Sequence, residues 1–239
     1  EKELYVHDTL IRLCDYGTPN QEDDLATLTV YGALVTHAPV CEGYARATQY
    51  LLTRLQIPNY LVVGTATDTN SGKAEAHMWN VVTIDGKKYC LDVTWDDHTK
   101  TGQRGNAKDP SHIYFNVTAE ELAKTHRAKR QEAVASCVYT EANYFKKEGL
   151  LFTRFSEEEE KVLLSAMTRA LQNGEKTVEL RFKSKEAMAD ARESLIQNRG
   201  VFRLLSGANA GVSAQKRVSA DKVRYAENTN LFVLSLQFY

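Results

Sequence analysis

The dipeptide Asp85-Gly86 places the strongest constraint on how this chain can fold. It lies between two runs rich in β-forming residues, 77–84 and 87–95, and Asp-Gly between such runs is typical of a two-residue hairpin loop. A hairpin centred on this loop pairs residues whose numbers sum to 171. The sequence therefore predicts an antiparallel pair of strands with a defined register.

This register brings His77 close to Asp92. Trp79 is expected opposite Asp92, and His77 opposite Thr94, so His77 and Asp92 are diagonal neighbours on one face. The backbones of diagonal neighbours lie roughly 7–8 Å apart, which lets a carboxylate accept a hydrogen bond from an imidazole N–H. An Asp that holds a His in one tautomer is half of a nucleophile–base–orienter arrangement.

Cys41 is the best-placed cysteine to supply the nucleophile. Apolar and small residues recur after it at helix spacing, so we expect Cys41 to open a helix that ends before Pro58. A helix N-terminus lowers the pKa of a thiol, and its N–H groups can hold an oxyanion. The alternative for a cysteine among small residues is a buried core position. We interpret the other three cysteines as structural: Cys14, Cys90 and Cys137.

The composition of the 239 residues excludes several classes of function. Thirty Lys and Arg residues stand against 31 Asp and Glu residues, and a net charge of −1 does not indicate a nucleic-acid groove or a basic membrane patch. The longest uncharged run contains residues 25–40 and is interrupted by threonines and a proline, so no membrane span is predicted. No cysteines have C-x-x-C spacing, and we predict neither a metal nor a cofactor.

The pattern of elements changes near residue 145, which predicts two domains, 1–145 and 146–239. The second domain has the order β-α-β-α-β-β, which indicates a small α+β domain similar to the ferredoxin-like kind. Its expected elements are strand 150–154, helix 156–172, strand 177–182, helix 184–198, a loop at 207–211, and strands 222–225 and 231–238. Its role is not evident from the sequence, and binding of another protein is one alternative.

Three ordered sequence blocks carry a family resemblance. They are V-C-E-G-Y-A-R-A from Val40, H-M-W-N from His77 and Y-C-L-D-V-T-W-D-D from Tyr89. Separations of 36 residues from Cys41 to His77, and of 15 from His77 to Asp92, fit the same pattern. These blocks resemble the bacterial transglutaminase-like superfamily, relatives of papain-like cysteine proteases. The resemblance covers roughly residues 1–145.

The resemblance implies a fold and a set of roles. The expected fold is an α+β core in which the helix bearing Cys41 packs on an antiparallel sheet bearing His77 and Asp92. Cys41 would be the nucleophile, His77 the general base and acid, and Asp92 the residue that orients His77.

Three aromatic residues near these blocks are further candidates. Trp79 would shield the His–Asp hydrogen bond, and Tyr31 would donate to an oxyanion; both have a structural core position as their alternative. Trp95 would shape the cleft with Asp96. The stretch Asp96-Asp97-His98 has the further alternative of a solvated strand end, with too few ligands for a metal site.

The predicted function is cysteine-dependent amide chemistry on protein or peptide substrates through an acyl-enzyme. Water as the second substrate gives a peptidase or amidase, and a Lys amine gives a transglutaminase; we favour hydrolysis because water needs no dedicated amine site. The alternative is a catalytically silent binding or cell-surface interaction module with the same fold. The resemblance implies an extracellular or cell-envelope protein, and a reduced Cys41 would equally suit the cytoplasm. Because the chain opens inside a predicted helix, we expect an upstream segment.

Overall fold

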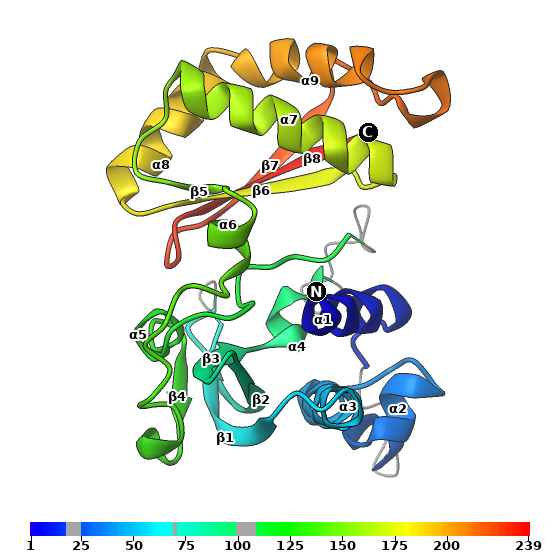
Figure 1. The fold of residues 1–239 in the computed structure, drawn as a ribbon, viewed down its shortest axis with the longest axis vertical. Helices are drawn as coiled ribbons and strands as arrows, with labels where there is room; N and C mark the ends of the chain where they lie inside the picture. Colours follow the sequence, from blue (N-terminus) through cyan, green and yellow to red (C-terminus); the bar gives the residue numbers. More distant parts are fainter. Residues whose placement is uncertain (18–24, 69–70, 99–108) are drawn as a thin grey trace. The chain divides into compact units, whose positions relative to one another are not determined.

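The structure, a computed structural model, describes residues 1–17, 25–68, 71–98 and 109–239. The described residues divide into two compact units, Glu1–Tyr144 and Phe145–Tyr239 (Figure 1). The division lies one residue from the boundary expected from the sequence. Among the described residues, no helix has both the length and the apolar character that crossing a membrane requires.

The first unit is an α+β structure built on a four-stranded antiparallel sheet (Figure 1). Its strand order is β3-β2-β1-β4, with bounds β1 (Asn59–Thr67), β2 (Ala74–Ile84), β3 (Lys87–Leu91) and β4 (His126–Ala128). Its helices are α1 (Lys2–Leu13), η1 (Leu25–Leu28), α2 (Val30–Leu34), α3 (Cys41–Arg54), α4 (Val93–Asp96), α5 (Ala119–Leu122) and η3 (Gln131–Ala133), and α6 (Tyr144–Lys147) begins at its last residue.

The hairpin between β2 and β3 has the predicted register. Ile84 pairs with Lys87 and Asn80 pairs with Leu91, so the paired numbers sum to 171. Asp85 has a φ of 49°, a left-handed conformation that Asp tolerates and that a tight hairpin turn requires. The prediction for this hairpin is therefore confirmed as far as Leu91.

Beyond Leu91 the predicted strand 87–95 is wrong. Asp92 instead caps α4, because its Oδ1 accepts the N–H groups of Thr94 at 3.0 Å and Trp95 at 3.2 Å. A side chain that satisfies these N–H groups turns the chain into a helix. The same turn leaves the other carboxylate oxygen of Asp92 directed toward β2.

Helix α3 is the central helix of the first unit. It contacts β1 and β2 of the sheet, and also α1 and α2 (Figure 1). Its buried side chains recur every three or four residues, and Tyr44 and Leu52 join Leu10, Ile11 and Leu91 in one fully buried apolar cluster. This packing fixes the start of α3 against the sheet.

Gly43, in the first turn of α3, permits a close approach to the preceding chain. A Cβ at this position would lie 2.3 Å from the Thr27 carbonyl oxygen and 2.8 Å from Cβ of Pro39. The same carbonyl accepts the N–H of Val40 at 3.0 Å. The absence of a side chain at Gly43 therefore positions the beginning of α3, where Cys41 lies.

The second unit has helices packed on a mixed four-stranded sheet (Figure 1). The strand order is β5-β6-β8-β7, with bounds β5 (Leu151–Phe152), β6 (Thr177–Phe182), β7 (Val223–Asn228) and β8 (Val233–Phe238). Its helices are α7 (Glu157–Asn173), α8 (Lys185–Arg192), the π-helical turn η4 (Glu193–Gln197), α9 (Gly200–Ala210) and η5 (Ala214–Lys216). Helices α7 and α8 contact the sheet, and α9 contacts α7.

Two expectations for this unit need correction. The ferredoxin-like arrangement is wrong, because both helical connections precede the final β7–β8 hairpin and β5 pairs directly with β6 in parallel. The loop expected at 207–211 falls largely in α9, where Leu204, Leu205 and Ala208 are buried. Burial of this apolar face outweighs the helix-breaking tendency of the glycine at position 207.

Candidate active site

Three elements of the first unit bring Cys41, His77 and Asp92 together. Cys41 opens α3, His77 lies in β2 and Asp92 precedes α4. His77 Nε2 lies 2.6 Å from Asp92 Oδ2, and the Cys41 thiol is hydrogen-bonded to the His77 side chain. Because Asp92 engages Nε2, Nδ1 is the ring nitrogen that remains for the thiol.

The position of Cys41 combines partial burial with a helix N-terminus. It is the first residue of a 14-residue helix whose N-cap, Val40, makes no side-chain capping hydrogen bond. The backbone N–H groups of the first turn and the helix dipole therefore act on the thiol. Cys41 is partly exposed, and the other three cysteines are buried, as interpreted from the sequence.

Electrostatics favour the charged forms of Cys41 and His77. Burial raises the pKa of the Cys41 thiol, but the hydrogen bond and the charge of His77, with a hydrogen bond from the Met78 backbone, lower the pKa below its ordinary value. Burial lowers the pKa of His77, but the charge and hydrogen bond of Asp92, together with those of Cys41, raise it to about 9. The two shifts favour a thiolate–imidazolium pair near neutral pH.

His126 is a residue of the candidate site that the sequence reasoning missed. Its Nε2 lies 2.9 Å from Asp92 Oδ2, and its Nδ1 lies 2.8 Å from the Thr125 hydroxyl. Burial raises the pKa of Asp92, but the charge of His77 and the hydrogen bonds of His126 and His77 hold it well below its usual range. His126 reaches the site from β4, which pairs with β1 rather than with the hairpin, so no local sequence signal connects it to Asp92.

Tyr16 is a second residue that the sequence did not single out. Burial and the charge of Cys41 raise the pKa of its hydroxyl to about 12, while a hydrogen bond from the Cys41 backbone lowers it. The hydroxyl of Tyr16 therefore lies beside the Cys41 main chain, near the thiol. No motif marks Tyr16, since it follows α1 and lies 25 residues before Cys41.

The three aromatic candidates lie in different environments. Trp79 is buried and its ring stacks on His77, with centroids 6.0 Å apart. Trp95 contacts the rings of His77 and His126 at centroid distances of 6.2 and 4.7 Å. Tyr31 lies in α2 with 57% of its surface exposed, and its role as an oxyanion donor stays a prediction.

Asp96 and Asp97 do not form a solvated strand end. Both are buried, Asp96 at the end of α4 and Asp97 immediately after it. The Tyr44 hydroxyl donates a hydrogen bond to Asp97, and the Tyr114 N–H donates to Asp96 at 2.9 Å. The interpretation of this stretch as solvated is therefore wrong, because neighbouring elements supply hydrogen-bond donors to the buried carboxylates.

Comparison with known proteins gives partial likenesses at the level of structure. No family model and no curated protein sequence matches the chain. A candidate cysteine protease from Cytophaga hutchinsonii is 21% identical over 38% of this chain and 30% of that chain, with a TM-score of 0.30. Arylamine N-acetyltransferase NAT3 from Bacillus cereus, which has a Cys-His-Glu triad, is 15% identical over 37% of this chain and 39% of its own, with a TM-score of 0.31.

A third solved structure is also similar to part of this chain. Arylamine N-acetyltransferase C from Bacillus anthracis is 14% identical over 46% of each chain, with a TM-score of 0.31. The matched part of this chain spans less than half of each of these three structures. At this level of similarity the likenesses do not define the activity of the chain, and the functional argument rests on the geometry of its own residues.

Proposed function

We propose that the first unit is a cysteine-dependent enzyme that acts on amide bonds of proteins or peptides through an acyl-enzyme on Cys41. The observation that carries this proposal is that His77 joins a partly exposed thiol at a helix N-terminus to a buried carboxylate. A thiol alone would be equally compatible with redox, metal-binding or packing roles. Its pairing with an oriented imidazole supports nucleophilic catalysis.

Acylation would use the ionised pair. The Cys41 thiolate attacks the amide carbonyl carbon, so that a C–S bond forms and the π electrons of the carbonyl move to oxygen. As the tetrahedral intermediate collapses, the C–N bond breaks and the His77 imidazolium protonates the leaving nitrogen. The products are a thioester on Cys41 and a free amine, with His77 neutral and hydrogen-bonded to Asp92.

The developing oxyanion needs donors near the thiol. The Cys41 backbone N–H already donates to the Tyr16 hydroxyl, so the N–H groups that follow it in the first turn of α3 are the backbone donors we propose. We assign the second donor to the Tyr16 hydroxyl, since it lies against the Cys41 backbone. Tyr31, the donor expected from the sequence, is the alternative.

Deacylation decides between two reactions. Water or a primary amine attacks the thioester carbon while neutral His77 removes its proton, the C–S bond breaks, and Cys41 leaves as the thiolate. Water gives hydrolysis, and a Lys side chain gives transamidation. We favour hydrolysis because it needs no binding site for an amine.

A single experiment tests the reaction and separates its two forms. The full chain is incubated with a library of Gln-containing peptides and a fluorescent primary amine, and the products are identified by mass spectrometry. We expect backbone cleavage or conversion of Gln to Glu, which Cys41→Ala abolishes and Cys137→Ala leaves in place. Cys41-dependent attachment of the amine to a peptide would show that the reaction is transamidation rather than hydrolysis. The lack of any Cys41-dependent product would contradict the proposal.

The competing function is a binding module that retains the fold without the chemistry. The conjunction of a lowered thiol pKa, a raised imidazole pKa and a buried Asp92 favours the enzyme, because a module selected only for binding has no need of this charge arrangement. In either case the second unit, Phe145–Tyr239, is proposed to bind a protein partner.

An extracellular or cell-envelope location is part of the proposal, and the resemblance of the three sequence blocks supports it. Fractionation of the native cells, followed by detection with an antibody to the chain, tests this location. We expect the protein in the culture medium or envelope fraction. Recovery with soluble cytoplasmic proteins would contradict this location.

A further inference from the structure

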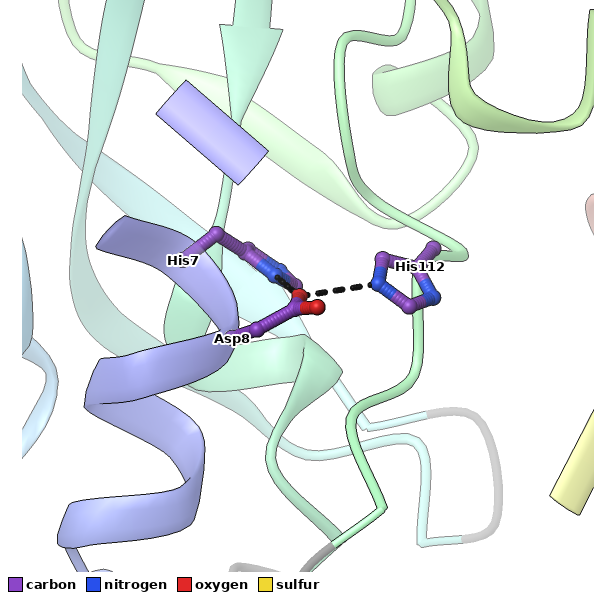
Figure 2. Close-up of side chains that lie close together, drawn as sticks. All are labelled: His7, Asp8 and His112. Carbon is purple, nitrogen blue, oxygen red and sulfur yellow. Dashed lines mark hydrogen bonds and ion pairs between the residues drawn. The ribbon is translucent and has the colours of Figure 1, made fainter. Parts of the chain in front are cut away.

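A second cluster of titratable side chains in the first unit has no part in the proposed reaction. Figure 2 shows His7 and Asp8, both from α1, lying close to His112 from the segment that precedes α5. Asp8 Oδ1 lies 2.9 Å from His7 Nδ1 and 2.9 Å from His112 Nε2. Two imidazole nitrogens and one carboxylate oxygen therefore all lie within 4.8 Å of one another.

The orientation of both rings is fixed by further contacts. His7 Nε2 lies 3.1 Å from Asp96 Oδ2, so that the ring of His7 lies between two carboxylates. The ring of His112 stacks on Tyr144, with centroids 3.7 Å apart and planes 7° apart. A buried carboxylate behind one histidine and a stacked ring behind the other resemble the outer contacts that orient metal ligands in proteins.

The number of protons that His7 can carry limits how its ring can interact with both carboxylates. A neutral imidazole carries one N–H, yet both nitrogens of His7 face carboxylate oxygens. If the Nε2 proton is donated to Asp96, a lone pair on Nδ1 faces the lone pairs of Asp8. Only a positive charge between these atoms relieves the repulsion, and it is supplied either by a second proton or by a metal ion.

We propose that His7 Nδ1, the Asp8 carboxylate and His112 Nε2 bind a divalent transition-metal ion of the Zn²⁺ type. Two imidazoles and one carboxylate form a common ligand set for such ions, with a fourth position filled by water. Ligand atoms about 2.0–2.1 Å from Zn²⁺ lie about 3.3–3.5 Å apart in a tetrahedral site, so the two N···O separations of 2.9 Å need to widen by about 0.5 Å. Asp96 accepts the Nε2 proton of His7 and so holds Nδ1 ready for the metal.

Exposure distinguishes this cluster from the one around Asp92. The latter also joins two histidines to one carboxylate, but its side chains are at most 3% exposed. The Asp8 and His112 side chains retain 17% and 10% exposure, which gives an ion and its water ligand an access route. A metal ion bound by Asp92 and its two histidines would also occupy His77 Nε2, the nitrogen through which Asp92 orients the His77 ring. We therefore assign the metal to His7, Asp8 and His112.

The expected role of the metal is to join distant parts of the first unit. It would link α1 to the segment around His112, and through Asp96 it would support α4, which begins directly after Asp92. A metal that binds the folded chain and not the unfolded one raises thermal stability. This role does not depend on whether Cys41 is a nucleophile.

The test uses the full chain with Cys41→Ala, which removes the partly exposed thiol that would otherwise compete for the ion. The protein is treated with a chelator, dialysed and titrated with Zn²⁺ in a calorimeter, and its melting temperature is measured with and without Zn²⁺. Asp8→Asn and His112→Gln are added separately on this background. His37→Asn, an exposed histidine in a left-handed conformation that Asn accepts, is the matched control.

We expect one Zn²⁺ per chain and a higher melting temperature. Asp8→Asn and His112→Gln should each weaken binding by more than roughly 100-fold, and Asp96→Asn by roughly 10- to 100-fold. His37→Asn and His126→Gln should leave binding unchanged. Loss of binding in His126→Gln, with binding retained in Asp8→Asn, would place the ion at Asp92 and overturn the proposal, as would the lack of stoichiometric binding.

A spectroscopic measurement keeps the proposal testable if a ligand variant fails to fold. Co²⁺ replaces Zn²⁺ in the Cys41→Ala chain, and the visible absorption reports its coordination. Strong d–d bands without a sulfur charge-transfer band indicate tetrahedral N and O ligands and would support the site. A sulfur band would place the ion on a remaining cysteine, and weak bands would indicate a hydrated surface ion; both results would overturn the proposal.

Discussion

His126 Nε2 lies 2.9 Å from Asp92 Oδ2, the oxygen that His77 Nε2 approaches to 2.6 Å. The opposite oxygen of Asp92 accepts two backbone N–H groups at the start of α4. The carboxylate is therefore held by four donors, and its side chain is buried. Rotation of the Asp92 side chain would break several of these hydrogen bonds at once, so its position relative to His77 is well defined.

His126→Ala is expected to lower kcat by roughly 10- to 100-fold, since a hydrogen bond to a charged group contributes about 1.5–3 kcal/mol. KM should change little, because His126 acts through Asp92 rather than on substrate. His126→Gln should recover part of the loss, as its amide can still donate to Asp92. Steady-state kinetics on the peptide substrate, with circular dichroism to confirm folding, provide the measurement. A wild-type kcat in His126→Ala would contradict this prediction, because it would show that His77 and the backbone donors hold Asp92 in position without His126.

The proposed thiolate–imidazolium pair of Cys41 and His77 predicts the pH dependence of kcat/KM. His77 must be protonated to donate to the leaving nitrogen, and its raised pKa means that activity falls as the pH rises through about 9. Cys41 must be deprotonated, and its lowered pKa means that the acidic limb lies below the ordinary pKa of a thiol. A pH profile of kcat/KM tests both limbs. Activity that rises toward the ordinary thiol pKa, without a plateau at neutral pH, would contradict the ion pair.

Selective alkylation of Cys41 is expected at neutral pH. Iodoacetamide should label Cys41 faster than a free thiol, because a larger fraction of the group is thiolate. His77→Ala should slow labelling to the rate of an ordinary thiol or below it. In the folded Cys41→Ala chain almost no label should enter, since Cys14, Cys90 and Cys137 are buried. Mass spectrometry after timed quenching measures these rates. Equal rates for Cys41 and a free thiol, unaffected by His77→Ala, would favour the binding module.

Tyr16→Phe distinguishes the two candidate oxyanion donors. Removal of its hydroxyl should lower kcat by roughly 10²- to 10³-fold, the range found for single oxyanion donors, with a smaller change in KM. Tyr5→Phe, on an exposed tyrosine of α1, is the matched control and should be neutral. Kinetics on the same peptide substrate give the comparison. A large loss in Tyr31→Phe with wild-type activity in Tyr16→Phe would return the role to Tyr31.

Gly43→Ala is expected to destabilise the first unit and displace Cys41. The added Cβ meets the Thr27 carbonyl, a backbone atom that cannot move independently of its helix. Overpacking of this kind costs about 1–3 kcal/mol of unfolding free energy. Urea unfolding monitored by circular dichroism measures the loss, and the Cys41 alkylation rate should fall as well. Gly207→Ala is the control, because its Cβ would meet only the flexible Leu164 side chain; equal stabilities of the two variants would show that α3 can shift without penalty.

The parts of the fold that follow from short-range chemistry can be predicted from the sequence. The β2–β3 register is predictable because one dipeptide determines both the turn and the pairing. Likewise, Ser156 begins α7 as expected, since the Glu159 carboxylate accepts its N–H at 2.8 Å. The end of β3 is not predictable in this way, because an Asp can continue a strand or cap a helix, and the choice depends on the residues that surround α4.

The candidate site likewise has parts that can be predicted from the sequence and parts that cannot. The proximity of His77 and Asp92 follows from hairpin geometry, even though Asp92 lies just beyond the paired strand. His126 does not follow from it, because β4 reaches the site through pairing with β1. The contact between His7 and His112 joins residues 105 apart in the sequence, and only tertiary packing of α1 brings them together.

Asp92 caps α4 and, in the proposed reaction, also orients His77. A single substitution can separate these two roles. Asn caps a helix about as well as Asp, so Asp92→Asn can preserve the turn into α4. The amide would nevertheless carry no charge to stabilise the imidazolium, and a comparable exchange in a serine protease triad lowers kcat by roughly 10⁴-fold. One nucleotide substitution at the Asp92 codon, which is enough to exchange Asp for Asn, would thus turn the proposed catalyst into a stable scaffold. Descendants of such a gene could keep the fold under selection for binding alone.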